Sequence, residues 1–101
     1  LNTLVAGLYA KYPRAFILLI TGMTREKDRE RYEQYTAAML EVARLKAVPV
    51  LDMYHHGLMN PCIPAIKALR MPDGAHMTLA GLELYTAQII GFLRQVGALG
   101  D

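Results

Sequence analysis

An unbroken run of apolar residues extends from Ala15 to Ile20, is closed by Thr21 and leads directly into Gly22. A strand with one face in water alternates apolar and polar residues, and this run has no such alternation. It therefore predicts a strand covered on both faces, which is typical of a parallel sheet in an α/β protein. A second, shorter strand is predicted over residues 48–52, where Pro49 favours a strand start or a sheet edge.

Helical periodicity surrounds these two strands. The predicted helices cover residues 1–12, about 26–46, about 63–69 and about 79–96. Pro13 ends the first of them, and Thr78 is the predicted N-cap of the last. The order strand, helix, strand around residues 26–46 is a βαβ unit.

The number of predicted strands is too small for a free-standing sheet. Two parallel strands do not make a stable sheet, and a strand that is apolar on both faces needs a neighbour on each side. The sequence offers only one such neighbour for residues 15–21. Residues 1–101 are therefore predicted to be one domain, or a piece of one, whose further strands lie upstream or come from another molecule.

Composition excludes several classes of function. A net charge of +2, with basic and acidic residues interspersed, does not indicate a nucleic-acid-binding protein. The longest apolar run is far too short to span a bilayer. The only cysteine, Cys62, cannot form an internal disulfide, so the cellular compartment stays open. An apolar fraction of 53% suits a chain that buries part of its surface against a partner.

Asp73 and His76 form the strongest chemical motif. They stand three residues apart in a Pro- and Gly-containing loop that leads into the last predicted helix. In an α/β sheet such a loop lies at the carboxyl ends of the strands, where active sites assemble. A carboxylate in this position can orient the imidazole, which then accepts a proton from a nucleophile. The alternative interpretation is an Asp that caps a turn and a His that follows it by chance.

The segment Pro72-Asp73-Gly74-Ala75-His76, with Gly81 five residues later and a closing apolar helix, resembles the last conserved block of GDSL/SGNH-type ester hydrolases. Residues 12–21 are similar to that family's penultimate core strand, and residues 47–54 to the strand before its final loop. The resemblance implies the C-terminal part of a flavodoxin-like, three-layer α/β/α fold. It also implies a catalytic Asp73–His76 pair, a small-molecule or carbohydrate ester as substrate, and no cofactor or metal.

The family also needs residues that this chain does not contain. Its nucleophilic Ser, its oxyanion-hole Gly and its Asn all precede the region of similarity, and the chain has no serine at all. Met77 and Leu82 stand where the family commonly has Pro and His. The chain is thus expected to supply the Asp–His pair of a parent carboxylic ester hydrolase and to be inactive alone. The alternative is a non-catalytic α/β fragment that self-associates through an unpaired strand edge.

Three other groups are candidate functional residues. The adjacent His55 and His56 lack companion ligands at metal-binding spacing and are interpreted as a surface loop or pocket wall. Cys62 has no neighbouring feature that would activate a thiol and is interpreted as buried or idle. Arg25, after the first strand, is interpreted as a solvated charge at the helix entry, with contact to an acidic substrate group as the alternative.

Overall fold

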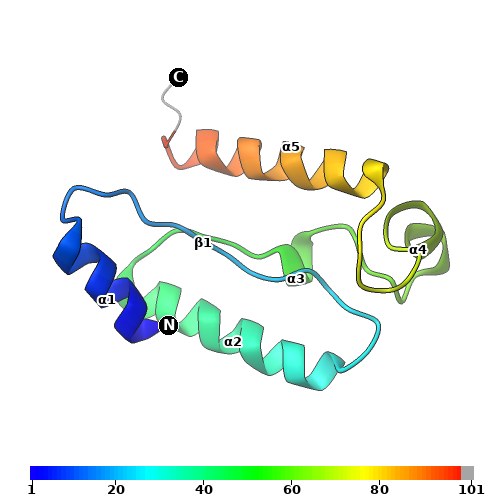
Figure 1. Ribbon diagram of the computed structural model, residues 1–101, viewed down its shortest axis with the longest axis horizontal. Coiled ribbons are helices and arrows are strands. Elements are labelled where there is room, and N and C mark those ends of the chain that lie inside the picture. Colours follow the sequence, from blue (N-terminus) through cyan, green and yellow to red (C-terminus); the bar gives the residue numbers. More distant parts are fainter. Residues whose placement is uncertain (99–101) are drawn as a thin grey trace.

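The computed structural model describes residues 1–98, which form five helices and two short strands (Figure 1). In chain order these are α1 (Asn2–Lys11), β1 (Leu19–Ile20), α2 (Arg29–Lys46), β2 (Val50–Leu51), α3 (Met53–His56), α4 (Pro64–Arg70) and α5 (Leu79–Gln95). The four predicted helices are confirmed to within three residues at each end, and α3 is an additional one.

β1 and β2 pair in parallel, with Leu19 opposite Val50, so the prediction of an α/β chain with parallel strands is confirmed. The N–H groups of Leu19 and Thr21 donate to the carbonyls of Pro49 and Leu51, at 2.9 and 3.0 Å. Alternate backbone groups of a strand point to opposite edges. β1 therefore has a second edge, which faces away from β2. Among residues 1–98, no strand pairs with that edge.

Two parts of the strand prediction were wrong for the chain as it stands. The ladder covers only residues 19–20 of the apolar run 15–21, because β2 supplies a partner over that length alone. The run is also not covered on both faces by the described residues. Phe16 is 56% exposed and residues 17–20 are half-buried.

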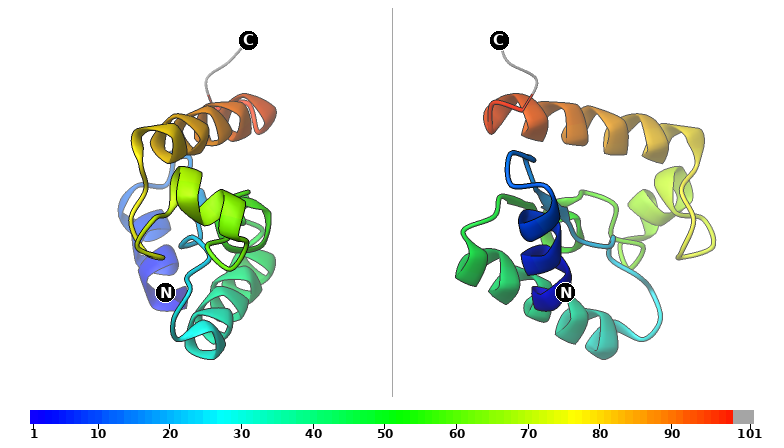
Figure 2. Two further views of the ribbon diagram at one scale, coloured as in Figure 1. Left: turned by 90° about the vertical axis from the view of Figure 1, so that its right-hand side faces the viewer. Right: turned by 60° about the vertical axis from the view of Figure 1, so that its left-hand side comes forward.

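Helices lie on both sides of the strand pair. α5 runs along one side of the strand pair, and α1 and α2 lie together on the other side (Figures 1 and 2). α4 packs against α5 and lies at the end of the molecule where α5 begins (Figure 1). No helix in the described part of the chain is both long and apolar enough to cross a membrane.

The fully buried core is a cluster of three methionines, Met53, Met59 and Met71. All three follow β2 in the chain, so the core lies at the carboxyl end of the strands, underneath the loop that carries Asp73 and His76. Partly buried side chains from β1, β2 and α5 pack around it. Met71, one member of this cluster, stands two residues before Asp73 in the chain.

The outer helices bury less than their periodicity predicts. On α1 only Val5 is buried, while Leu4 and Leu8 remain exposed. On α5, Leu82 is exposed, and Gly81 is buried. The chain thus carries more exposed apolar surface than its helices would have against a complete sheet.

The start of α5 is fixed by its cap. Thr78 accepts a hydrogen bond from the N–H of Gly81 through its hydroxyl, which confirms it as the N-cap. The same hydroxyl donates to the carbonyl of Leu69 in α4, at 2.6 Å. A Cβ on Gly81 would lie 2.9 Å from the carbonyl oxygen of Arg70. Glycine at this position therefore lets α5 approach the end of α4 closely, and the cap ties the two helices together.

Candidate functional site

The loop between α4 and α5 is anchored at Met71 and at Gly74, on either side of Asp73. Met71 anchors its start in the core, and its carbonyl accepts from the N–H of Gly74 at 2.9 Å. Gly74 has φ +80°, a left-handed conformation that favours glycine. A Cβ there would also collide with the Glu26 side chain, since it would lie 2.5 Å from Oε2. The glycine of the motif is thus required by the turn and by the loop that follows β1.

Asp73 and His76 are brought together as the sequence predicts. The Nδ1 atom of His76 lies 2.6 Å from Oδ2 of Asp73. The other carboxylate oxygen accepts the backbone N–H groups of Ala75 and His76, at 2.8 and 2.7 Å. One carboxylate therefore closes the turn and at the same time fixes the imidazole, so the capping and orienting interpretations describe the same residue.

The electrostatics of the pair suit proton transfer. The backbone N–H groups of His76 and Ala75, and then the His76 imidazole, hold the pKa of the Asp73 carboxyl well below its usual range. Asp73 therefore stays ionised, and its Oδ2 accepts from the ring and selects the His76 tautomer with hydrogen on Nδ1. The His76 side chain is 85% exposed, and among residues 1–98 no group bonds its Nε2. That nitrogen is open to a proton donor.

A hollow of about 350 Å³ reaches the loop of the pair at Ala75, and neither Asp73 nor His76 lines it. It is walled by the residues that follow β1, by the first half of α2, by Tyr54 and by Tyr85 of α5, and Ala75 joins it to the motif. The lining residues are Thr21, Gly22, Met23, Arg25, Tyr32, Tyr35, Thr36, Met39, Tyr54, Ala75 and Tyr85. The hollow thus spans the carboxyl end of β1 and extends to both helical sides of the strand pair.

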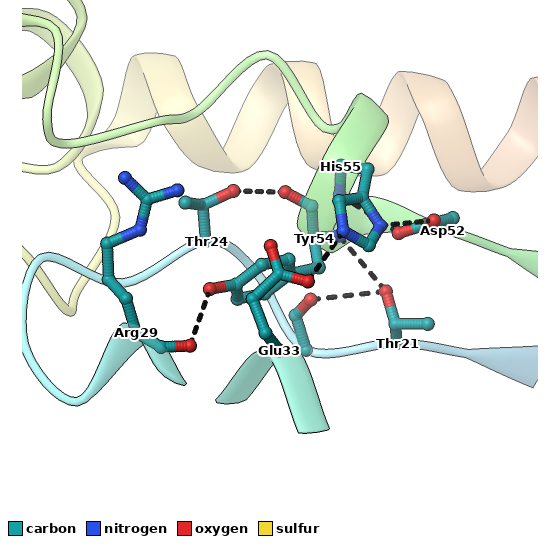
Figure 3. Close-up of polar contacts among 8 residues, drawn as sticks. Thr21, Thr24, Arg29, Glu33, Asp52, Tyr54 and His55 are labelled. Carbon is teal, nitrogen blue, oxygen red and sulfur yellow. Dashed lines mark hydrogen bonds and ion pairs between the residues drawn. The ribbon is translucent and has the colours of Figure 1, made fainter. Parts of the chain in front are cut away.

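A second Asp–His pair with the same spacing follows β2 (Figure 3). Asp52 accepts from the His55 backbone N–H at 2.9 Å and contacts its Nδ1 at 2.7 Å. On the other side of the ring, Nε2 lies 2.9 Å from Oε2 of Glu33 in α2. Both nitrogens of His55 are engaged by carboxylates, so this imidazole, unlike His76, has no free position for a substrate proton.

The pKa values of this cluster follow from its hydrogen bonds. The bond to Asp52, and then the bond to Glu33, raise the pKa of the His55 imidazole above its usual value. Partial burial acts to raise the pKa of the Asp52 carboxyl, but the backbone and ring hydrogen bonds of His55 outweigh it and the pKa is lowered. The hydrogen bonds of the cluster thus favour the charged forms of His55 and Asp52 and link α2 to the segment that follows β2.

Buried threonines hold α3 against the segment that follows β1 (Figure 3). Thr21 accepts the backbone N–H of Tyr54 at 3.0 Å, and the Thr24 hydroxyl donates to the Tyr54 carbonyl. The Tyr54 hydroxyl donates to the carbonyl of Arg29 at 3.3 Å. These bonds satisfy the buried hydroxyls and fix the floor of the hollow relative to α2.

The remaining candidates have ordinary surroundings. Cys62 is exposed, and its Sγ accepts from the guanidinium of Arg29 at 3.4 Å. Arg25 stacks on the ring of Tyr32, with 4.7 Å from its Cζ atom to the ring centroid. Within residues 1–98, no three His, Cys, Asp or Glu side chains are grouped so that they could hold a metal ion. The two carboxylates at His55 lie on opposite sides of the ring and do not converge.

Sequence reasoning missed the Glu33–His55–Asp52 cluster. The signal for half of it was present, because Asp52 and His55 have the same spacing as Asp73 and His76 and directly follow a predicted strand. Glu33 stands 22 residues before His55, and no local pattern links the two.

Comparison with known proteins yields one informative likeness. A chain of known crystal structure superposes with a TM-score of 0.82 and 28% sequence identity, covering 94% of this chain and 50% of that chain. The present chain therefore spans about half the length of that solved chain. No protein-family model matches the sequence, and no curated protein is significantly similar to it.

Proposed function

We propose that this chain is the part of a serine ester hydrolase that carries the Asp and His of the catalytic triad. The observation that carries the proposal is the 2.6 Å contact between Asp73 and Nδ1 of His76, with Nε2 open to solvent, in a loop whose Ala75 borders a hollow. This is the arrangement that a general base needs. The resemblance of residues 72–81 to the last block of GDSL/SGNH-type hydrolases supports the same reaction class.

In the proposed mechanism a serine from the other part of the parent protein attacks the carbonyl carbon of a carboxylic ester. His76 takes the hydroxyl proton on Nε2 and later gives it to the leaving alcohol. Asp73 keeps the Nδ1–H tautomer and stabilises the imidazolium. Donors in the other part would hold the oxyanion. The acyl group and the alcohol are not specified by these residues.

The fold supports a parent of about twice this length. The likeness to one half of a larger solved chain shows that this arrangement of helices and strands occurs inside a bigger protein. The unpaired edge of β1, and the exposed Phe16 in the segment that leads into β1, suit a further parallel strand. With that strand and its neighbours the proposed parent has a flavodoxin-like, three-layer α/β/α sheet.

The coding sequence immediately upstream of Leu1 tests this proposal directly. We expect a Gly-Asp-Ser block followed by a Gly-x-Asn-Asp block in the same reading frame. An unrelated domain or an immediate start codon would leave Asp73 and His76 without a nucleophile and would contradict the proposal.

The second candidate function is self-association of a non-catalytic fragment. The observation that favours it is the same β1 edge, because an apolar edge strand is a template for pairing with another copy.

We expect the isolated chain to form dimers or larger species in light scattering, and Phe16→Lys to shift it to the monomer by placing a charge beside the edge. Leu79→Lys is the matched control, since Leu79 is 71% exposed at the start of α5. A monomeric wild-type chain, or equal effects of both variants, would count against edge pairing.

A further inference from the structure

His55 lies between two carboxylates from different elements. Its Nδ1 faces Asp52 at the end of β2, and its Nε2 faces Glu33 on α2 (Figure 3). A neutral imidazole has one N–H and one lone pair, so it can donate to only one of the two. The contacts of 2.7 and 2.9 Å on opposite sides of the ring are satisfied together only when both nitrogens carry hydrogen.

We infer that His55 is a pH-operated clasp between α2 and the β2–α3 turn, closed when the imidazole is charged and opened on the Glu33 side when it loses its proton. Closed, the clasp joins the first half of α2 to the end of β2. Open, it leaves the lone pair of Nε2 facing the Glu33 carboxylate, and two acceptors repel each other.

The Asp52 contact is the one that survives deprotonation. Asp52 is the less exposed carboxylate, with 15% of its side chain accessible against 45% for Glu33. Its second oxygen already accepts the backbone N–H of His55 at 2.9 Å, so it remains in place whichever way the ring is charged. Glu33 has no hydrogen bond to any described residue other than His55. The neutral ring therefore keeps hydrogen on Nδ1.

Released Glu33 has a second partner within reach. Arg29 lies four residues earlier on α2, which places it on the same face of the helix. Both side chains line a hollow of about 270 Å³ that His55 and Tyr54 also border. In the closed state Arg29 contacts Sγ of Cys62 instead. Glu33 can thus exchange an interhelical contact for one within α2.

The charged and titratable groups around His55 are few. Besides Asp52 and Glu33, the rings of Tyr54 and His56 lie 5.1 and 6.2 Å from it between centroids, and Arg29 lines the same hollow. The two carboxylates are hydrogen-bonded to the ring nitrogens, whereas Tyr54 makes only an edge-to-face contact with the ring. They therefore dominate the field at the imidazole.

The direction of the pH dependence follows from linkage. The pKa of His55 is raised in the folded protein, so its contribution to stability is complete below the unfolded-state pKa of about 6.5. That contribution is lost as the pH rises through the higher pKa of the folded state. The clasp is accordingly closed below about pH 6.5 and opens as the pH rises through the raised pKa of His55.

The test is a pH titration of the chain of residues 1–101 from pH 5 to 9, in which ¹⁵N and ¹H NMR follows the histidine rings. We expect the His55 midpoint above about 6.5 and, at high pH, ¹⁵N shifts of the tautomer with hydrogen on Nδ1. Glu33→Gln should lower the midpoint, because it removes one of the two negative charges. Glu30→Gln is the matched control on α2 and should leave the midpoint unchanged.

Two readouts can overturn the inference without depending on an unstable variant. A wild-type midpoint at or below that of an unstructured histidine would show that the ring is not held between two anions. A high-pH tautomer with hydrogen on Nε2 would show that Glu33, rather than Asp52, is the retained partner. Equal midpoints in Glu33→Gln and Glu30→Gln would remove Glu33 from the clasp.

Discussion

His76→Ala, made in the proposed parent ester hydrolase, is expected to lower kcat by about four to six orders of magnitude. Removal of the general base leaves the serine protonated, and only substrate binding and the oxyanion donors still contribute to catalysis. The imidazole contacts no part of the core and its side chain is 85% exposed, so the fold should be unaffected. Steady-state kinetics with a p-nitrophenyl ester, together with circular dichroism, measure both effects.

The two Asp-x-x-His motifs provide a matched control. Asp73→Asn should lower kcat by about 10⁴-fold, because an amide no longer selects the Nδ1–H tautomer of His76. Asp52→Asn makes the same change three residues before His55. Both ring nitrogens of His55 contact carboxylates, so this histidine has no nitrogen free for a substrate proton. The kcat of Asp52→Asn should stay within about threefold of wild type, after correction for the folded fraction. Equal losses in the two variants would contradict the assignment of His76 as the base.

The isolated chain should show no saturable hydrolysis of p-nitrophenyl acetate. It contains no serine, and an exposed imidazole alone reacts with this ester no faster than free imidazole does. A saturable rate that disappears in His76→Ala would mean that the chain holds its own nucleophile. Cys62→Ala would then decide whether the thiol is that nucleophile.

The sequence predicts local features of this fold better than extended ones. The helices α2 and α5 follow from periodicity, and the α5 cap follows from Thr78, because each depends on residues within a few positions. α3 was missed because it has only four residues and begins directly after β2, with Asp52 as its cap. The length of β1 was wrong because hydrogen bonds to β2, rather than apolar character, define the ladder.

At the candidate site, too, the sequence predicts the local contact and misses the one between distant residues. Asp73 and His76 could be placed together from sequence, since a turn of three residues brings them within 2.6 Å. The contact between Glu33 and His55 depends on how α2 packs beside β2, and no spacing rule contains that information. Burial was overestimated for Phe16 because an unbroken apolar run predicts a covered strand without showing what covers it.

Met71→Ala is expected to destabilise the chain by about 2–5 kcal/mol, the range for truncating a buried methionine, leucine or isoleucine. Met71 is fully buried and packs with Met53 and Met59 in the one cluster of buried apolar side chains described. The free energy of unfolding of a small domain is about 5–15 kcal/mol, so this loss is a large fraction of the total stability. Urea denaturation followed by circular dichroism measures it as a lower midpoint at unchanged slope.

Leu79→Ala is the control, because Leu79 is 71% exposed and its truncation should cost no more than about 0.5 kcal/mol. If both variants lose the same free energy, the methionine cluster is not the core of the fold. Met71 also precedes the site by two residues, and its carbonyl holds the N–H of Gly74. In the parent protein, Met71→Ala should therefore reduce ester hydrolysis through the position of His76, and the loss of kcat per folded molecule would separate this effect from unfolding.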